Sequence, residues 1–177
     1  MDAPVGGAHK TRWLILIYHL PRLPSRHRVA VWRKLKTLGA LYLQDGVVAL
    51  PEDAVTREQL EWLQLRVREA GGEATLWEAL PNTFDEGRAL VEEFRASREE
   101  AYRDLIDAAE KLGRKAMLEA DGTALLEELA GIERDFRAER RRDYFRSPLR
   151  KEADAAIRDT RRTLKEGVEQ ASREVTG

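Results

Sequence analysis

The chain has 177 residues, a formal net charge of −1 and 36% charged residues, a charged fraction well above the roughly 25% of an average soluble domain. It contains no cysteine, which excludes disulfide scaffolds, thiolate metal sites and cysteine nucleophiles. Its longest apolar run, residues 13–18, is far shorter than the roughly 20 residues of a membrane-spanning helix, and the first residues lack the pattern of a signal peptide, so we expect a cytoplasmic protein with no membrane association.

The near-zero net charge is the sum of three unlike blocks: a basic first part, an acidic middle and a basic last part. Residues 1–50 contain eight Lys/Arg and two Asp/Glu, residues 51–135 contain eleven and twenty-two, and residues 136–177 contain twelve and eight. Such asymmetry is informative about partners rather than about fold. Two basic blocks around an acidic one predict binding to a polyanion, or to the acidic block of the same or another chain.

The first predicted elements are a strand and a helix. Residues 13–18 are large and apolar in succession, which is typical of a strand buried on both faces. A helix follows over residues 25–38, with Ser25 as its N-cap and Gly39 just after its end. Its apolar positions recur every three residues: Val29, Trp32, Leu35 and Leu38.

A hairpin and a second helix–strand pair come next. Asp45-Gly46 between the apolar runs 40–43 and 47–50 predicts a tight turn that needs positive φ. Thr56 and Gln59 have the spacing of a capping box, which predicts a helix over residues 56–70. A strand is expected over residues 74–77, so the order is β-α-β-β-α-β, the split βαβ of a ferredoxin-like fold. The second face of such a sheet is left for a partner, a second copy or the remainder of the chain.

The second half of the sequence is predicted to be helical. A long helix is expected over residues 84–119, a break at 121–123, and a helix with its apolar stripe within residues 125–136. A second break at 143–148 precedes a last helix, whose apolar stripe runs from Ala153 to Val175. We therefore predict an α+β chain in which long helices form a hairpin or three-helix extension.

In terms of domains, we expect a ferredoxin-like domain over residues 12–80 and a subdomain of long helices over residues 81–177. The four tryptophans, Trp13, Trp32, Trp62 and Trp77, each fall in a predicted element and are expected to anchor the core.

The first candidate site is a cluster of basic residues around the first helix. Its members are Arg22, Arg26, Arg28, Arg33, Lys34 and Lys36. We expect Arg26, Arg33 and Lys34 to share one side of the helix, away from the apolar positions. Lys and Arg that displace counterions from phosphates give sequence-independent, salt-sensitive affinity for nucleic acid. The other interpretation is a solvated polar face.

Three consecutive arginines, Arg140, Arg141 and Arg142, form a second basic candidate. They would provide further phosphate contacts, or they would neutralise carbonyls and acidic neighbours at a helix end docked by Tyr144 and Phe145.

Nothing in the sequence indicates an enzyme. Adjacent acidic residues such as Glu92-Glu93 diverge by about 100° on a helix and do not converge on a metal, and His19 has no Asp, Ser or Cys near it in the sequence. There is no glycine-rich phosphate loop and no nucleophile elbow. We expect no catalytic residue, no metal site and no cofactor.

The stretch from Tyr18 to Gln44, which includes His-Leu-Pro-Arg-Leu-Pro-Ser-Arg-His-Arg, resembles the N-terminal domain of the chromate-resistance regulator ChrB family. Residues 46–51, 69–73 and 142–148 are also similar, so the resemblance covers about residues 12 to 175. The opening is similar, too, to the middle domain of phenylacetate-type repressors and, more remotely, to the ferredoxin-like CRISPR integration nuclease. That nuclease has an acidic residue where Tyr18 and His19 stand here, which argues against metal-dependent cleavage.

The resemblance implies a DNA-binding transcriptional regulator, or regulator module, of chromate or oxyanion resistance. We expect a homodimer that presents two copies of the first helix to one duplex. The full-length regulators carry a further C-terminal domain associated with oxyanion sensing. This chain ends at Gly177 without such a domain, so, if it is a full-length protein, we expect it to bind without sensing, or to sense through a partner. The alternative is a non-enzymatic interaction module that homo-oligomerises or binds an acidic or basic protein partner.

Overall fold

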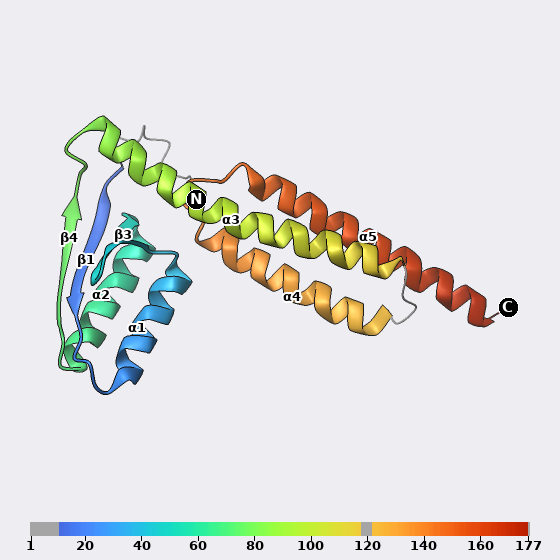
Figure 1. Cartoon of the computed structure of the whole chain (residues 1–177), viewed down its shortest axis with the longest axis horizontal. Helices are drawn as coiled ribbons and strands as arrows, with labels where there is room; N and C mark the ends of the chain where they lie inside the picture. Colours follow the sequence, from blue (N-terminus) through green and yellow to red (C-terminus); the bar gives the residue numbers. More distant parts are fainter. Residues whose placement is uncertain (1–10, 118–121, 177) are drawn as a thin grey trace. The chain divides into compact units, whose positions relative to one another are not determined.

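The computed structural model describes residues 11–117 and 122–176 (Figure 1). The chain packs as two compact units, Met1–Phe94 (unit 1) and Arg95–Gly177 (unit 2). The division falls within one helix, α3 (Phe84–Ala116), whose first residues belong to unit 1 and whose remainder belongs to unit 2. The domain boundary expected after residue 80 stays a prediction.

Unit 1 has the predicted ferredoxin-like fold. Its elements are β1 (Trp13–His19), α1 (Ser25–Leu38), β2 (Leu41–Gln44), β3 (Val47–Pro51), α2 (Ala54–Glu69) and β4 (Glu73–Ala79). All strand pairs are antiparallel and the strand order is β2-β3-β1-β4. The α+β prediction and the order of its elements are therefore confirmed.

The two faces of the sheet are covered differently. Alternate residues of β1 and β3 are completely buried beneath the helices, among them Leu14, Leu16 and Leu50, and Figure 1 shows α1 and α2 on the same side of the sheet. On the opposite face Trp13 stacks against Phe94 of α3, with 5.3 Å between ring centroids. Farther along that face, Trp77 remains exposed beside Ile15, its partner in the ladder.

The glycines at the turns have the predicted positive φ, whereas the N-cap residues of α1 and α2 differ from those predicted. Gly39 and Gly46 have φ values of 69° and 72°, as the helix end and the hairpin require. Ser25 is the first residue of α1 and caps nothing, because Pro24 occupies the N-cap. The cap of α2 is Asp53: its carboxylate accepts from the Thr56 N–H at 2.7 Å, and the Thr56 hydroxyl accepts from the Asp53 N–H at 2.9 Å. Thr56 thus takes part in a capping box, but at N3 rather than at the N-cap.

The prediction that all four tryptophans anchor the core is wrong for three of them. Trp13 is 1% exposed, but Trp32, Trp62 and Trp77 are 50–59% exposed. For Trp32 the reason is geometric, since residues three apart on a helix drift by 60° per step and four of them cannot share one face. The residues that α1 buries are instead Val31 and Leu35, which are four positions apart.

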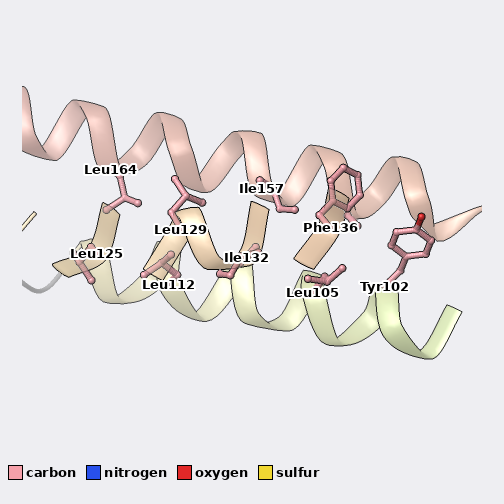
Figure 2. Close-up of a cluster of buried hydrophobic side chains, with 11 residues drawn as sticks. Tyr102, Leu105, Leu112, Leu125, Leu129, Ile132, Phe136, Ile157 and Leu164 are labelled. Carbon is pink, nitrogen blue, oxygen red and sulfur yellow. The ribbon is translucent and has the colours of Figure 1, made fainter. Parts of the chain in front are cut away.

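Unit 2 is a three-helix arrangement of the later part of α3 with α4 (Gly122–Arg141) and α5 (Leu149–Thr176). Figure 2 shows side chains from these helices meeting in one core. The stripe expected on α4 is confirmed, because Leu125, Leu129, Ile132 and Phe136 are all buried.

One of the two breaks expected in unit 2 is wrong. Of the break predicted at 121–123, Asp121 lies outside the described residues, and residues 122 and 123 are already helical. The last helix begins at Leu149, immediately after Pro148, so the break predicted at 143–148 is confirmed.

Candidate nucleic-acid interface

Helix α1 contributes little to the core and carries a concentrated positive charge. It contains no acidic residue, and it buries only Val31 and Leu35. Five exposed basic residues lie on it and a sixth precedes it: Arg26, Arg28, Arg33, Lys34, Lys36 and Arg22. Of these, Arg22, Arg26, Arg28, Arg33 and Lys34 form no ion pair within residues 11–117 and 122–176.

Helical geometry separates these cations into three directions. At 100° per residue, Arg26 and Arg33 lie within about 20° of each other, opposite the buried Val31–Leu35 stripe. Arg28 lies on one flank of that stripe and Lys34 on the other. The outward face therefore consists of Arg26 and Arg33, with Lys34 and Lys36 turned about 60–100° to either side of them, and the expectation that Lys34 shares their side stays a prediction.

The flank of α1 that carries Arg28 borders a cavity of about 490 Å³. Its lining residues combine aromatic rings, cations and one acid: Tyr18, His19, Leu20, Arg22, Arg28, Trp32, Tyr42, Asp45 and Gly46. Burial, followed by the neighbouring Tyr18 and Asp45, raises the pKa of Tyr42. The Lys36 ammonium lies 5.8 Å from the centre of the Trp32 ring. Aromatic planes next to guanidinium groups are suited to stacking on unpaired bases while holding a phosphate.

The other flank borders a shallow groove between α1 and α2. This groove, about 420 Å³ in volume, is lined by Ala30, Val31, Lys34, Gln59, Trp62, Leu63 and Arg66. Trp62 is 59% exposed at its edge. An exposed tryptophan beside apolar side chains is a feature of protein-binding surfaces, so this flank has a different character from the cavity.

The three consecutive arginines at the end of α4 have different surroundings. Arg142 donates to the carboxylate of Glu139, which also accepts from Arg98. The guanidinium of Arg140 lies 5.9 Å from the centre of the Phe136 ring. Arg140 and Arg141 are exposed, and Arg142 is partly buried. Arg142 therefore serves the fold of unit 2, while Arg140 and Arg141 present their charge to solvent.

Sequence reasoning missed the aromatic part of the site around α1. Tyr18 lies on β1 and Tyr42 on β2, the two strands that flank β3, so their association depends on how both strands pair with β3. Trp32 was assigned to the core, although its position between Arg28 and Arg33 was a local signal of a different role. No group of three His, Asp or Glu residues able to hold a metal occurs in the described parts of the chain. None of the helices seen there is long and apolar enough to cross a membrane.

Comparison with known proteins gives two matches in sequence. A family model described as Protein ChrB, N-terminal, matches residues 28–176. Protein ChrB of Cupriavidus metallidurans (strain CH34) is 41% identical over 54 residues, which cover 30% of this chain and 17% of that protein. No solved structure matches.

Proposed function

Because the chain belongs to the ChrB N-terminal family, we propose that it is a DNA-binding regulatory module of chromate resistance that contacts phosphates through α1. The aligned segment spans only 17% of the matched relative, so the proposal concerns this module. On this proposal the chain catalyses no reaction, and it acts as a homodimer that presents two copies of α1 to one duplex.

The observation that carries the proposal is the unneutralised charge of α1. On the long helices, several exposed arginines pair with acidic residues one turn away, as in Arg88–Glu92 and Arg158–Asp154. On α1 neither Arg26 nor Arg33 has such a partner among the described residues. Unpaired cations on a rigid helix release counterions from DNA when they contact its phosphates, and each contact lowers the slope of log K against log salt by about 0.9.

The test is a double substitution on the outward face, Arg26→Ala with Arg33→Ala. Fluorescence anisotropy across a salt series would measure its affinity for a labelled duplex from upstream of its own gene and for a random duplex. We expect weaker binding and a salt slope smaller in magnitude by up to about 1.8. The matched control is Arg158→Ala with Arg162→Ala, which removes two charges from α5 that are also exposed but are ion-paired.

An unchanged slope in the Arg26/Arg33 variant, or an equal loss in the Arg158/Arg162 variant, would contradict the assignment of α1. Wild-type binding that is tighter to the upstream duplex than to the random one supports a regulator. Equal binding to both would reduce the proposal to a general polyanion surface.

The exposed Trp62 favours a second candidate function, a protein-interaction module that uses the groove between α1 and α2. In that case Trp62→Ala would disrupt self-association or partner binding, as measured by light scattering, while affinity for DNA stays at background. Trp77→Ala, which removes an equally exposed tryptophan from β4, is the control. Loss of association in both variants, or in neither, would argue against the groove.

A further inference from the structure

The cavity beside the Arg28 flank of α1 has a lining that contacts to phosphate alone do not explain. It measures about 490 Å³, within the range of cavities that hold small organic ligands. Its walls come from the end of β1, the connection to α1, α1 itself, β2 and the turn before β3, all within unit 1. A site for phosphate would need only cations, but three of its nine lining residues are Tyr or Trp and one is acidic: Tyr18, Trp32, Tyr42 and Asp45.

The strand and the hairpin that line the cavity are held together by their backbones. The N–H of Tyr18 donates to the carbonyl of Gly46 at 2.7 Å. Gly46 lies so close to β1 that a Cβ at this position would be 2.5 Å from the Tyr18 carbonyl oxygen. This side of the cavity is therefore formed before a ligand arrives, which lowers the entropic cost of binding.

Trp32 gives the cavity an aromatic surface that the fold does not bury. Its side chain is 50% exposed, and it lies one turn after Arg28 on the same side of α1. Exposed aromatic rings in nucleic-acid-binding proteins stack on bases, and a neighbouring guanidinium holds the attached phosphate. Trp32 and Arg28 are therefore placed to bind a planar ring and an anionic group of one ligand.

The charged groups of the cavity do not neutralise one another. Arg22, Arg28 and Asp45 are all exposed, and none of the three forms an ion pair within residues 11–117 and 122–176. A ligand that satisfies both signs of charge must carry an anionic group and also hydrogen-bond donors for the carboxylate. A nucleotide carries both at separate ends, as a phosphate and as the N–H groups on the Watson–Crick edge of its base.

We propose that this cavity binds a single nucleotide, with its base stacked on Trp32 and its phosphate held by Arg22 and Arg28. Asp45 accepts hydrogen bonds from the base, and guanine fits best because its N1–H and N2–H are adjacent donors that one carboxylate accepts together. The nucleotide is either free or an unpaired nucleotide of a nucleic-acid strand, since both offer the same ring and phosphate. The inference goes beyond the duplex contacts proposed for the outward face of α1 and does not depend on them.

The experiment titrates the full chain by calorimetry with guanosine monophosphate, and with ribose 5-phosphate as a ligand that has the phosphate but no base. We expect saturable binding of guanosine monophosphate and binding of ribose 5-phosphate that is weaker by about tenfold or more, as for a missing base–aromatic stack. Trp32→Ala should lose the same factor for guanosine monophosphate, whereas Trp32→Phe, which keeps a ring, should retain most of the affinity. Trp77→Ala, which removes an exposed tryptophan outside the cavity, is the control and keeps wild-type affinity.

The role of Asp45 is tested by Asp45→Asn, which keeps the size of the side chain. Asn-Gly suits the hairpin turn as well as Asp-Gly does, so the fold is unaffected. We expect weaker binding of guanosine monophosphate and unchanged binding of ribose 5-phosphate. Equal losses for the two ligands would contradict a contact between Asp45 and the base.

A parallel titration with a guanine-containing single strand of DNA distinguishes the two sources of the nucleotide. If the ligand belongs to a strand, Trp32→Ala weakens binding of the single strand and guanosine monophosphate competes with it. If the ligand is free, Trp32→Ala weakens binding of guanosine monophosphate and leaves binding of the strand unchanged.

Two results would overturn the proposal. One is ribose 5-phosphate binding as tightly as guanosine monophosphate, which would leave only exposed cations. The other is equal binding by wild type and Trp32→Ala, both to guanosine monophosphate and to the single strand. The Arg26/Arg33 variant is scored by its salt slope on duplex DNA, so the two proposals can fail independently.

Discussion

Glu139→Gln is expected to destabilise unit 2 strongly, because it removes a buried charge from between two guanidinium groups. The Glu139 side chain is 3% exposed, and it binds Arg98 of α3 and Arg142 at the end of α4. The Arg98 side chain is itself 14% exposed, and its Nε has no hydrogen-bond partner in the described structure. Glutamine keeps the shape of the side chain but leaves Arg98 as a buried and uncompensated charge.

The magnitude follows from the exposure of the two partners. Removing one member of a buried ion pair costs about 3–5 kcal/mol. Arg142 is 27% exposed and regains solvation when its partner is lost, so Arg98 accounts for most of the effect. We therefore expect Glu139→Gln to lower the free energy of unfolding of unit 2 by about 3 kcal/mol.

Helix α4 offers a matched control in Glu133. This residue also binds one arginine on its own helix, Arg137, and one on a neighbouring helix, Arg161. Its side chain is 21% exposed, and that of Arg161 is 46% exposed. Exposed pairs contribute about 1 kcal/mol or less, so Glu133→Gln should cost no more than that.

Urea unfolding with two probes locates the effect. All four tryptophans lie in unit 1, so their fluorescence reports on unit 1, whereas circular dichroism at 222 nm reports on the helices of both units. For Glu139→Gln the dichroism transition should move to lower urea while the fluorescence transition stays in place. Equal costs for Glu139→Gln and Glu133→Gln would refute the reasoning from burial.

Three further substitutions test other parts of the fold. Gly46→Ala places a Cβ 2.5 Å from the Tyr18 carbonyl oxygen at a φ of +72°, so it should destabilise unit 1 by at least about 1–2 kcal/mol, measured by the fluorescence transition. Asp53→Ala removes the cap of α2 and should cost about 1 kcal/mol in the same assay. Burial and the adjacent Asp143 raise the pKa of Tyr102, so the folded chain retains a proton that the unfolded chain releases near pH 10. The stability advantage of wild type over Tyr102→Phe should therefore shrink above pH 10, by up to about 1.4 kcal/mol per pH unit; a difference that is constant from pH 9 to 11 would contradict the raised pKa.

The elements of unit 1 were predictable because their signals are local. The apolar run of β1, Asp45-Gly46 in the hairpin and Gly39 after α1 each act within a few residues, and together they allow one order of elements. Cap positions were less predictable, because Asp53 and Thr56 are both good caps in isolation. Asp53 occupies the N-cap because it exchanges reciprocal hydrogen bonds with Thr56, and these bonds depend on where α2 begins.

The parts that depend on distant residues could not be predicted from local patterns. Arg98 and Glu139 are 41 positions apart, as are Tyr102 and Asp143. The sequence around each of these residues gives no indication of which distant residue it will contact. A charged residue is indistinguishable in sequence from a solvated one until its neighbours are known. The sequence therefore predicted both basic clusters, but it did not show that Arg142 belongs to the buried network of unit 2.

The charge of α1 is difficult to explain by stability alone. Like charges one turn apart, such as Arg33 and Lys36, destabilise a helix by about 0.2–0.5 kcal/mol per pair, and α1 has no acidic residue to offset them. The helix buries only Val31 and Leu35 and packs beside α2, and its arginines are all exposed. A helix selected only for folding would gain from acidic residues on that surface, as the long helices of unit 2 do. Within the described residues no carboxylate pairs with Arg26 or Arg33, so the proposed anionic partner would supply that neutralisation from outside.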